Sequence, residues 1–120
     1  RSTRQKLRAV VELLFDMAEQ DPIRLQYTFF TKHDEVFEGS VPLCLSQPAT
    51  VVQELLEEGM RLKQVRAGRP EIMAGAFAGI PLKIIEMKLK GVIDYPLADV
   101  LEETFALCWE AMSAKAASAK

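Results

Sequence analysis

Apolar residues recur at spacings of three and four along most of the chain, and this spacing is typical of amphipathic helices. Near the start, Leu7, Val11, Leu14 and Phe15 fall on one face of such a helix. Polar and apolar residues never alternate over a long stretch, so the pattern does not favour strands. Glycine and proline stand at a few separated points and divide the chain into segments. The pattern predicts five helices, over residues 3–20, 22–38, 48–63, 70–90 and 96–115.

The boundaries of these helices carry residues that are typical of helix ends. We expect Asp21 to cap the second helix, with Pro22 in its first turn. Pro48 and Pro70 are expected to open the third and fourth helices, because proline suits the first turn, where the N–H has no helical partner. Gly91 is a natural stop for the fourth helix, since glycine readily adopts the left-handed conformation that ends many helices.

The stretch 72–82 within the fourth helix contains no charged residue, so both of its sides must be covered. Pro81 lies inside this helix and has no N–H to donate to the carbonyl of Phe77, so we expect a kink there. The carbonyl that Pro81 leaves free has two interpretations. Either it accepts a hydrogen bond from a ligand, or the bend only fits the helix round its neighbours.

Five helices without strands predict an all-α fold, an antiparallel bundle in which residues 1–120 form a single domain. The last two helices are apolar over more than one stripe, and a domain of five helices can hardly cover two faces of each. We therefore expect a homodimer whose last two helices form a four-helix interface. The alternative is that the same residues pack within one chain. The residues expected at the interface are Ala74, Gly75, Ala78, Gly79, Leu101, Phe105, Cys108 and Met112.

Composition narrows the function further. The net charge of −2 argues against nucleic acid binding by this stretch, because binding phosphate needs a clustered basic surface. The chain begins at Arg1 with a helical pattern already running, so we interpret it as a fragment or a processed product. No signal peptide is recognisable, and the apolar stretch 72–82 is too short to span a bilayer. A cytoplasmic location is therefore expected.

The sequence offers little chemistry. It has no glycine-rich phosphate loop, no nucleophile elbow and no paired carboxylates on an apolar face, so an enzyme is not expected. His33 is the single histidine, and its neighbours Asp34 and Glu35 point about 100° apart on a helix, so no metal site or cofactor is expected. Cys44 and Cys108 are interpreted as two buried thiols, although the sequence also allows a disulfide between them.

The second half of the chain has a recognisable order of glycine, proline and apolar positions. Residues 51–59 end in glycine, Gly68-Arg-Pro70 opens an apolar helix of small residues, and Asp94-Tyr-Pro96 precedes a final helix that contains Trp109. This order resembles the C-terminal domain of TetR-type (tetracycline-repressor-like) transcriptional regulators. Residues 20–25 and the first helix are also similar to the family's fifth and sixth helices. Pro81 departs from the pattern, which has a continuous helix at that point.

The resemblance implies a homodimeric transcriptional regulator, most often a repressor. In this family the last two helices pair with those of the partner, and the domain encloses a cavity for a small, largely apolar effector. Occupation of the cavity changes the spacing of two DNA-reading heads, which belong to an N-terminal helix-turn-helix domain that is missing here. The expected partners are therefore a second copy, the effector and, through the missing domain, operator DNA.

The resemblance also implies a set of residues that enclose the effector, with Tyr27 and His33 supplying polar contacts. The alternative is that these residues are ordinary core. A different function stays open as well, that of a stand-alone helical module that dimerises or docks a protein partner and has no small-molecule ligand. The residues expected to line the cavity are Phe15, Tyr27, Phe30, His33, Met60 and Phe77.

Overall fold

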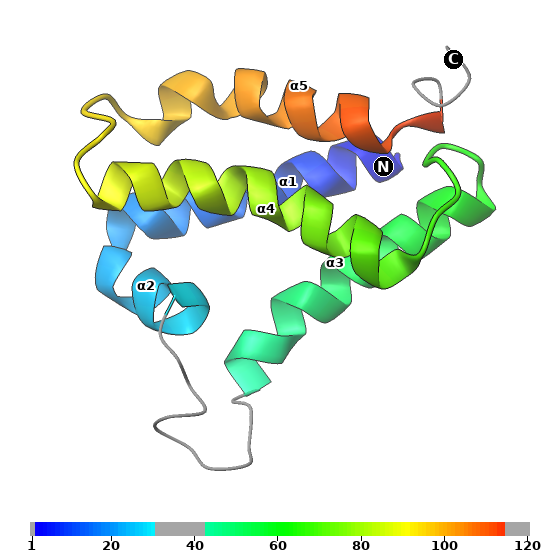
Figure 1. The fold of residues 1–120 in the computed structure, drawn as a ribbon, viewed down its shortest axis with the longest axis horizontal. Helices are drawn as coiled ribbons and strands as arrows, with labels where there is room; N and C mark the ends of the chain where they lie inside the picture. The colour runs from blue at the N-terminus through cyan, green and yellow to red at the C-terminus, as the bar shows by residue number, and fades with distance from the viewer. Residues whose placement is uncertain (1, 31–42, 115–120) are drawn as a thin grey trace.

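The computed structural model describes residues 2–30 and 43–114, which fold into helices joined by turns (Figure 1). Within this part of the chain the only extended pairing is an isolated antiparallel bridge between Val65 and Ser113. The predicted all-α fold is therefore confirmed. The helices are α1 (Thr3–Gln20), α2 (Pro22–Phe30), α3 (Leu43–Arg61), α4 (Pro70–Leu89), the short 3-10 helix η2 (Leu97–Val100) and α5 (Leu101–Met112).

Helix α1 begins and ends where the sequence predicts. At its start, Ser2 Oγ accepts a hydrogen bond from the backbone N–H of Gln5, and the Gln5 side chain accepts one from the N–H of Ser2. This reciprocal pair satisfies two backbone donors that a helix start leaves free. At the other end, Asp21 Oδ1 accepts from the N–H of Arg24 at 3.2 Å, so the predicted cap on α2 is confirmed.

Helix α1 is the centre of the packing. Every other helix contacts it, and in Figure 1 it passes behind α4, which lies side by side with α5 and runs in the opposite direction. Helix α3 crosses obliquely below them and packs on α1 and α4. One face of α1 is buried as its spacing predicts. The residues of that face are Thr3, Leu7, Val11, Leu14, Phe15 and Ala18.

Two predicted helices differ in extent from those in the structure. Helix α3 begins at Leu43, so the predicted start at Pro48 is wrong by five residues. Pro48 lies in the second turn, where its missing N–H interrupts only one backbone hydrogen bond and does not end the helix. Helix α2 is described as far as Phe30, and the remainder of the predicted helix, residues 31–38, lies outside the described residues.

The predicted fifth helix is divided in the structure. It consists of η2 and then α5, and Val100, the last residue of η2, has φ −118° and ψ 12°, outside the α-helical region. The predicted end near residue 115 is also wrong, because α5 ends at Met112. Ser113 is extended and pairs with Val65, so the chain leaves the helix to join the turn that follows α3.

Helix α4 continues through Pro81 and changes direction partway along its length (Figure 1). Pro70 occupies the first turn, as predicted, and the helix ends at Leu89. Gly91 follows with φ +79°, a conformation that glycine adopts without the steric cost that a Cβ adds. The predicted stop at Gly91 is thus confirmed.

Candidate functional site

Three of the predicted cavity residues belong to the hydrophobic core or pack against it. Phe15 from α1 and Phe77 from α4 are buried in the hydrophobic core, and Met60 from α3 packs against that core while partly exposed. Tyr27 lies on the surface of α2 with 39% of its area exposed. The side chain of Phe30 and all of His33 lie outside the described residues. The burial of these three residues fits either a cavity lining or a solid core.

Two hollows on the surface differ from the predicted cavity. One, of about 430 Å³, lies where α1 and α2 meet the end of α4, between Pro22, Ile23 and Leu89. The other, of about 390 Å³, lies along the first turns of α1 between Arg4, Arg8 and Glu12. Both are open to solvent, and of the predicted cavity residues whose side chains the structure describes, none lines either of them. These two hollows therefore give no support to an effector site.

The four interface residues predicted on the last helix lie inside the protein. Leu101, Phe105, Cys108 and Met112 are each at most 8% exposed and form one buried face of α5, which packs on α1 and α4. The chain itself already covers their side chains, which leaves no surface there for a second copy. These four residues therefore pack within one chain, which was the alternative to a dimer interface.

Phe105 illustrates how closely this face of α5 is occupied. The guanidinium carbon of Arg4 stands 5.3 Å from the centre of its ring, within the range of a cation–π contact. The ring of Trp109, on the same helix, is stacked against the ring of Phe105, and the two ring centroids are 6.4 Å apart. Next to them, Arg8 forms an ion pair with Glu102 and so ties α1 to α5. An aromatic ring enclosed in this way is a core anchor.

The carbonyl that Pro81 leaves free is taken by a thiol. Cys108 Sγ, on α5, donates a hydrogen bond to the carbonyl oxygen of Phe77 at 3.7 Å, and Cys108 is completely buried. Burial raises the pKa of the Cys108 thiol to about 11, so the proton needed for this hydrogen bond is retained at neutral pH. A ligand is not needed to satisfy that carbonyl. Cys108 is also free, so the disulfide with Cys44 that the sequence allowed is absent.

The interface residues predicted on α4 fall on two sides of the helix. Ala74 is buried and Ala78 partly buried, whereas Gly75 and Gly79 are exposed. A Cβ atom built on either glycine would meet no other atom within 4 Å. The outer surface of α4 at these two glycines is therefore open to anything that approaches it.

Two further residues extend this open surface, and sequence reasoning missed them. Ile72 is 64% exposed, and Ala76 is exposed beside it. Together with Gly75 and Gly79 they form the outer face of α4, an apolar surface that extends along two turns of the helix. Their spacing of three and four was the available signal. It was hidden because residues 72–82 are apolar all round, so the pattern could not show which side faces the core.

The described residues contain no group of three or more side chains suited to hold a metal ion. Among the helices described, none is long and apolar enough to cross a membrane. No family model, no curated protein and no solved structure matches the chain. The outer face of α4 is thus the feature from which a function has to be argued.

Proposed function

We propose that this chain is the effector-binding and homodimerisation domain of a TetR-type transcriptional regulator that acts as a repressor. Its ligand is a small, largely apolar molecule, and it acts on DNA through a helix-turn-helix domain that precedes it. The outer face of α4 is the observation that carries the proposal. The order of glycine, proline and apolar positions in the second half of the chain adds to it.

The outer face of α4 has the properties of a surface that a second copy covers. Ile72 offers an exposed apolar side chain, and the open space at Gly75 and Gly79 allows another helix to approach closely. Between Glu71 and Lys83 the helix carries no charged residue, and Lys83 pairs with Glu86 at 2.7 Å beyond the apolar part. Apolar centres with charged rims are usual at stable protein interfaces. Leu107 on α5, 54% exposed, adds apolar area on the other of the last two helices.

Charge placed on this face tests the dimer. We expect the wild-type chain to be dimeric at micromolar concentration and Ala76→Arg to be monomeric with an unchanged helical circular dichroism spectrum, because an unpaired guanidinium would have to be desolvated. Gln20→Arg, which adds the same charge at the exposed end of α1, is the matched control and should stay dimeric. Light scattering gives the mass directly. A monomeric wild-type protein would overturn the dimer.

The complete gene product tests the family assignment. We expect a helix-turn-helix domain directly before Arg1, and specific binding of the whole protein to DNA that flanks its own gene, measured by mobility shift at fixed salt. A preceding segment without that motif would refute the assignment, even if the chain proves to be a dimer.

Met60 tests the effector role because it lies partly exposed against the core. Indole, naphthalene and decanoate are suitable first probes in a thermal-shift assay. A ligand present at about 100 times its Kd adds about 2.7 kcal/mol to the stability of the folded state. Met60→Trp should remove such a shift by filling the space, while Leu62→Trp, at an exposed position two residues further on, should retain it. An equal shift in both variants would exclude Met60 from the site.

A second candidate is a helical dimerisation or docking module without a small-molecule ligand. The burial of Phe15 and Phe77 in the core favours it, as does the openness of the two described hollows. Two results together would establish this candidate instead. The chain would be dimeric with a melting temperature that no apolar probe raises, and the gene product would lack a helix-turn-helix domain.

A further inference from the structure

The turn that follows α3 holds parts of the chain that are far apart in sequence. Its shape comes from the end of the helix, where Lys63 donates to the carbonyl of Met60 and Gln64 to that of Gly59, with Lys63 at φ +61°. These two hydrogen bonds and the left-handed residue between them form a Schellman motif, which reverses the chain sharply. The reversal directs Gln64 and Val65 back toward α1 and α5.

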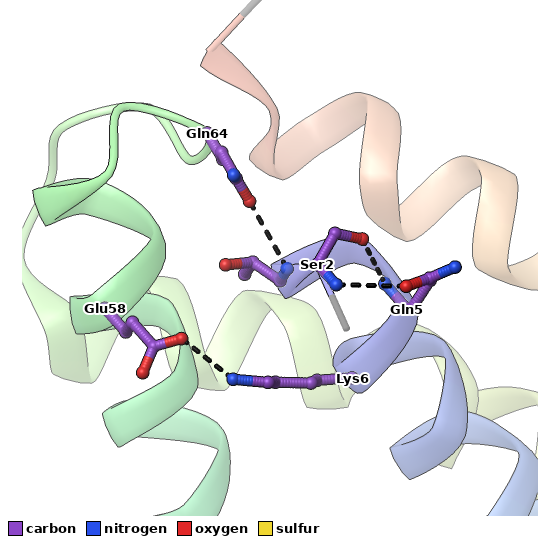
Figure 2. Close-up of polar contacts among 6 residues, drawn as sticks. Ser2, Gln5, Lys6, Glu58 and Gln64 are labelled. Atoms are coloured by element: carbon purple, nitrogen blue, oxygen red, sulfur yellow. Dashed lines mark hydrogen bonds and ion pairs between the residues drawn. The ribbon is translucent and has the colours of Figure 1, made fainter.

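On one side, this turn and the end of α3 bind the start of α1. The side-chain oxygen of Gln64 accepts a hydrogen bond from the backbone N–H of Thr3 at 3.3 Å, and Glu58 pairs with Lys6 at 3.0 Å. Figure 2 shows Gln64 and Glu58 both pointing at the first turn of α1, from the turn and from α3. The carboxylate is held in its charged form, because the hydrogen bond from Lys6 lowers the pKa of Glu58.

On its other side, the turn is hydrogen-bonded to the end of α5. The N–H of Arg66 donates to the carbonyl of Met112 at 2.8 Å, and the N–H of Ala114 donates to the carbonyl of Gln64 at 3.1 Å. Gln64 therefore contacts both ends, Thr3 through its side chain and Ala114 through its backbone.

The contact is tight enough to transmit a displacement. A Cβ atom on Gly59 would lie 2.4 Å from Val65 Cγ2 and 2.9 Å from Thr3 Cγ2, both closer than real Cβ atoms approach. Thr3 is only 2% exposed and Val65 also 2%. Because the packing has no slack, a movement of the end of α3 must move Thr3 with it or break the contact.

We propose that the turn of residues 59–66 is a relay, which couples the position of α3 to the first turn of α1 and the end of α5. It thereby sets the direction in which the chain before α1 approaches the domain. Its regulatory meaning rests on the proposed function, in which the DNA-binding domain precedes α1 and α3 borders the effector. Occupation of the effector site would displace α3, and the relay would pass that displacement to the DNA-binding domain.

Hydrogen exchange of backbone amides tests the coupling without any ligand. Gln64→Ala removes the hydrogen bond to Thr3, while it leaves the acceptors of Arg66 and Ala114 in place. If the turn is a relay, exchange should be at least about fivefold faster at the amides of Thr3, Arg66 and Ala114, because loss of the contact with α1 also weakens the contact with α5. Gln20→Ala, at the exposed end of α1, is the matched control and should change none of them. Faster exchange at Thr3 alone would overturn the coupling.

Binding to DNA tests the regulatory meaning in the complete gene product. Glu58→Gln, which weakens the pair with Lys6, should change the affinity for DNA flanking the gene at least about fivefold. Glu57→Gln, the exposed neighbour on α3, is the matched control and should bind as the wild type does. A protein that binds DNA with equal affinity in both variants overturns the regulatory role. A protein that binds no DNA refutes the proposed function, whereas the exchange experiment still decides the coupling.

Discussion

The inner face of α5 and the outer face of α4 are both apolar, yet their surroundings are opposite. Phe105 on α5 is 1% exposed and contacts both Arg4 and Trp109. Ile72 on α4 is 64% exposed, and the glycines next to it face open space. Burial within the chain already accounts for the first face, whereas nothing in the described part of the chain covers the second. The comparison separates residues that stabilise the fold from residues that remain for a partner.

The largest difference between the two faces should come from truncation of aromatic or aliphatic side chains on α5. Phe105→Ala is expected to lower the free energy of unfolding by about 3–5 kcal/mol, because it removes a fully buried ring and leaves a cavity. Leu107→Ala, two residues along on the exposed side of the same helix, should change that of the monomer by about 0.5 kcal/mol or less. Urea denaturation at a protein concentration low enough to keep the chain monomeric measures both. Equal losses would mean that the two sides of α5 are not distinct.

A smaller effect is expected at the place where the two helices meet. Cys108→Ala leaves the carbonyl of Phe77 without its donor, at a cost of about 1–3 kcal/mol for an unsatisfied buried group. Pro81→Ala restores an N–H that the same carbonyl accepts within α4. Cys108→Ala should therefore cost about 1 kcal/mol less in the Pro81→Ala background than in the wild type. Additive losses in this double-mutant cycle would show that the thiol and the proline are independent.

On the outer face of α4, alanine should act in two directions. Gly75→Ala and Gly79→Ala should each stabilise the monomer by about 0.5–1 kcal/mol, since alanine is the better helix former and its Cβ meets no atom of the chain. The same methyl groups should weaken the dimer, because they hold the partner helix away. Denaturation at low concentration measures the first effect, and the dimer dissociation constant measures the second. Stabilised monomers with an unchanged dimer would locate the interface elsewhere.

The smallest expected effect is a dependence of stability on pH. It arises at Glu58, which belongs to neither of the two faces. Lys6 lowers the pKa of Glu58 below the value of the unfolded chain, which is about 4.3. The sign follows from linkage: the stabilisation is complete above that value and is lost as the pH falls through the lower pKa of the folded state. Lys6→Met should flatten the decline of stability on the acid side. A curve that stays parallel to that of the wild type would show that the pair contributes nothing.

The sequence predicts the helices well because their causes are local. The spacing of Leu7, Val11 and Leu14 and the cap at Asp21 depend only on neighbours within a few residues, and both predictions are confirmed. The end of α5 lies next to a distant partner. Ser113 leaves its helix because Val65, far away in the sequence, offers it a bridge, and no local signal announces that pairing.

The candidate site was less predictable for the same reason. Phe105 and Ile72 both stand in apolar helices, and the sequence does not say which helix neighbour covers each of them. The pattern showed that residues 72–82 need cover on every side, but only the packing of α1, α3 and α5 on α4 shows which side is left open. Small residues such as Gly75 indicate a close approach without naming the partner that approaches.

The double role of Gln64 has a mechanical consequence. Because its side chain holds Thr3 and its backbone holds Ala114, a force that pulls on the two ends of the described chain would first load these two hydrogen bonds. The turn after α3 thus acts as a clasp that closes the chain into a ring, and the resistance of the whole domain to stretching begins at a single glutamine.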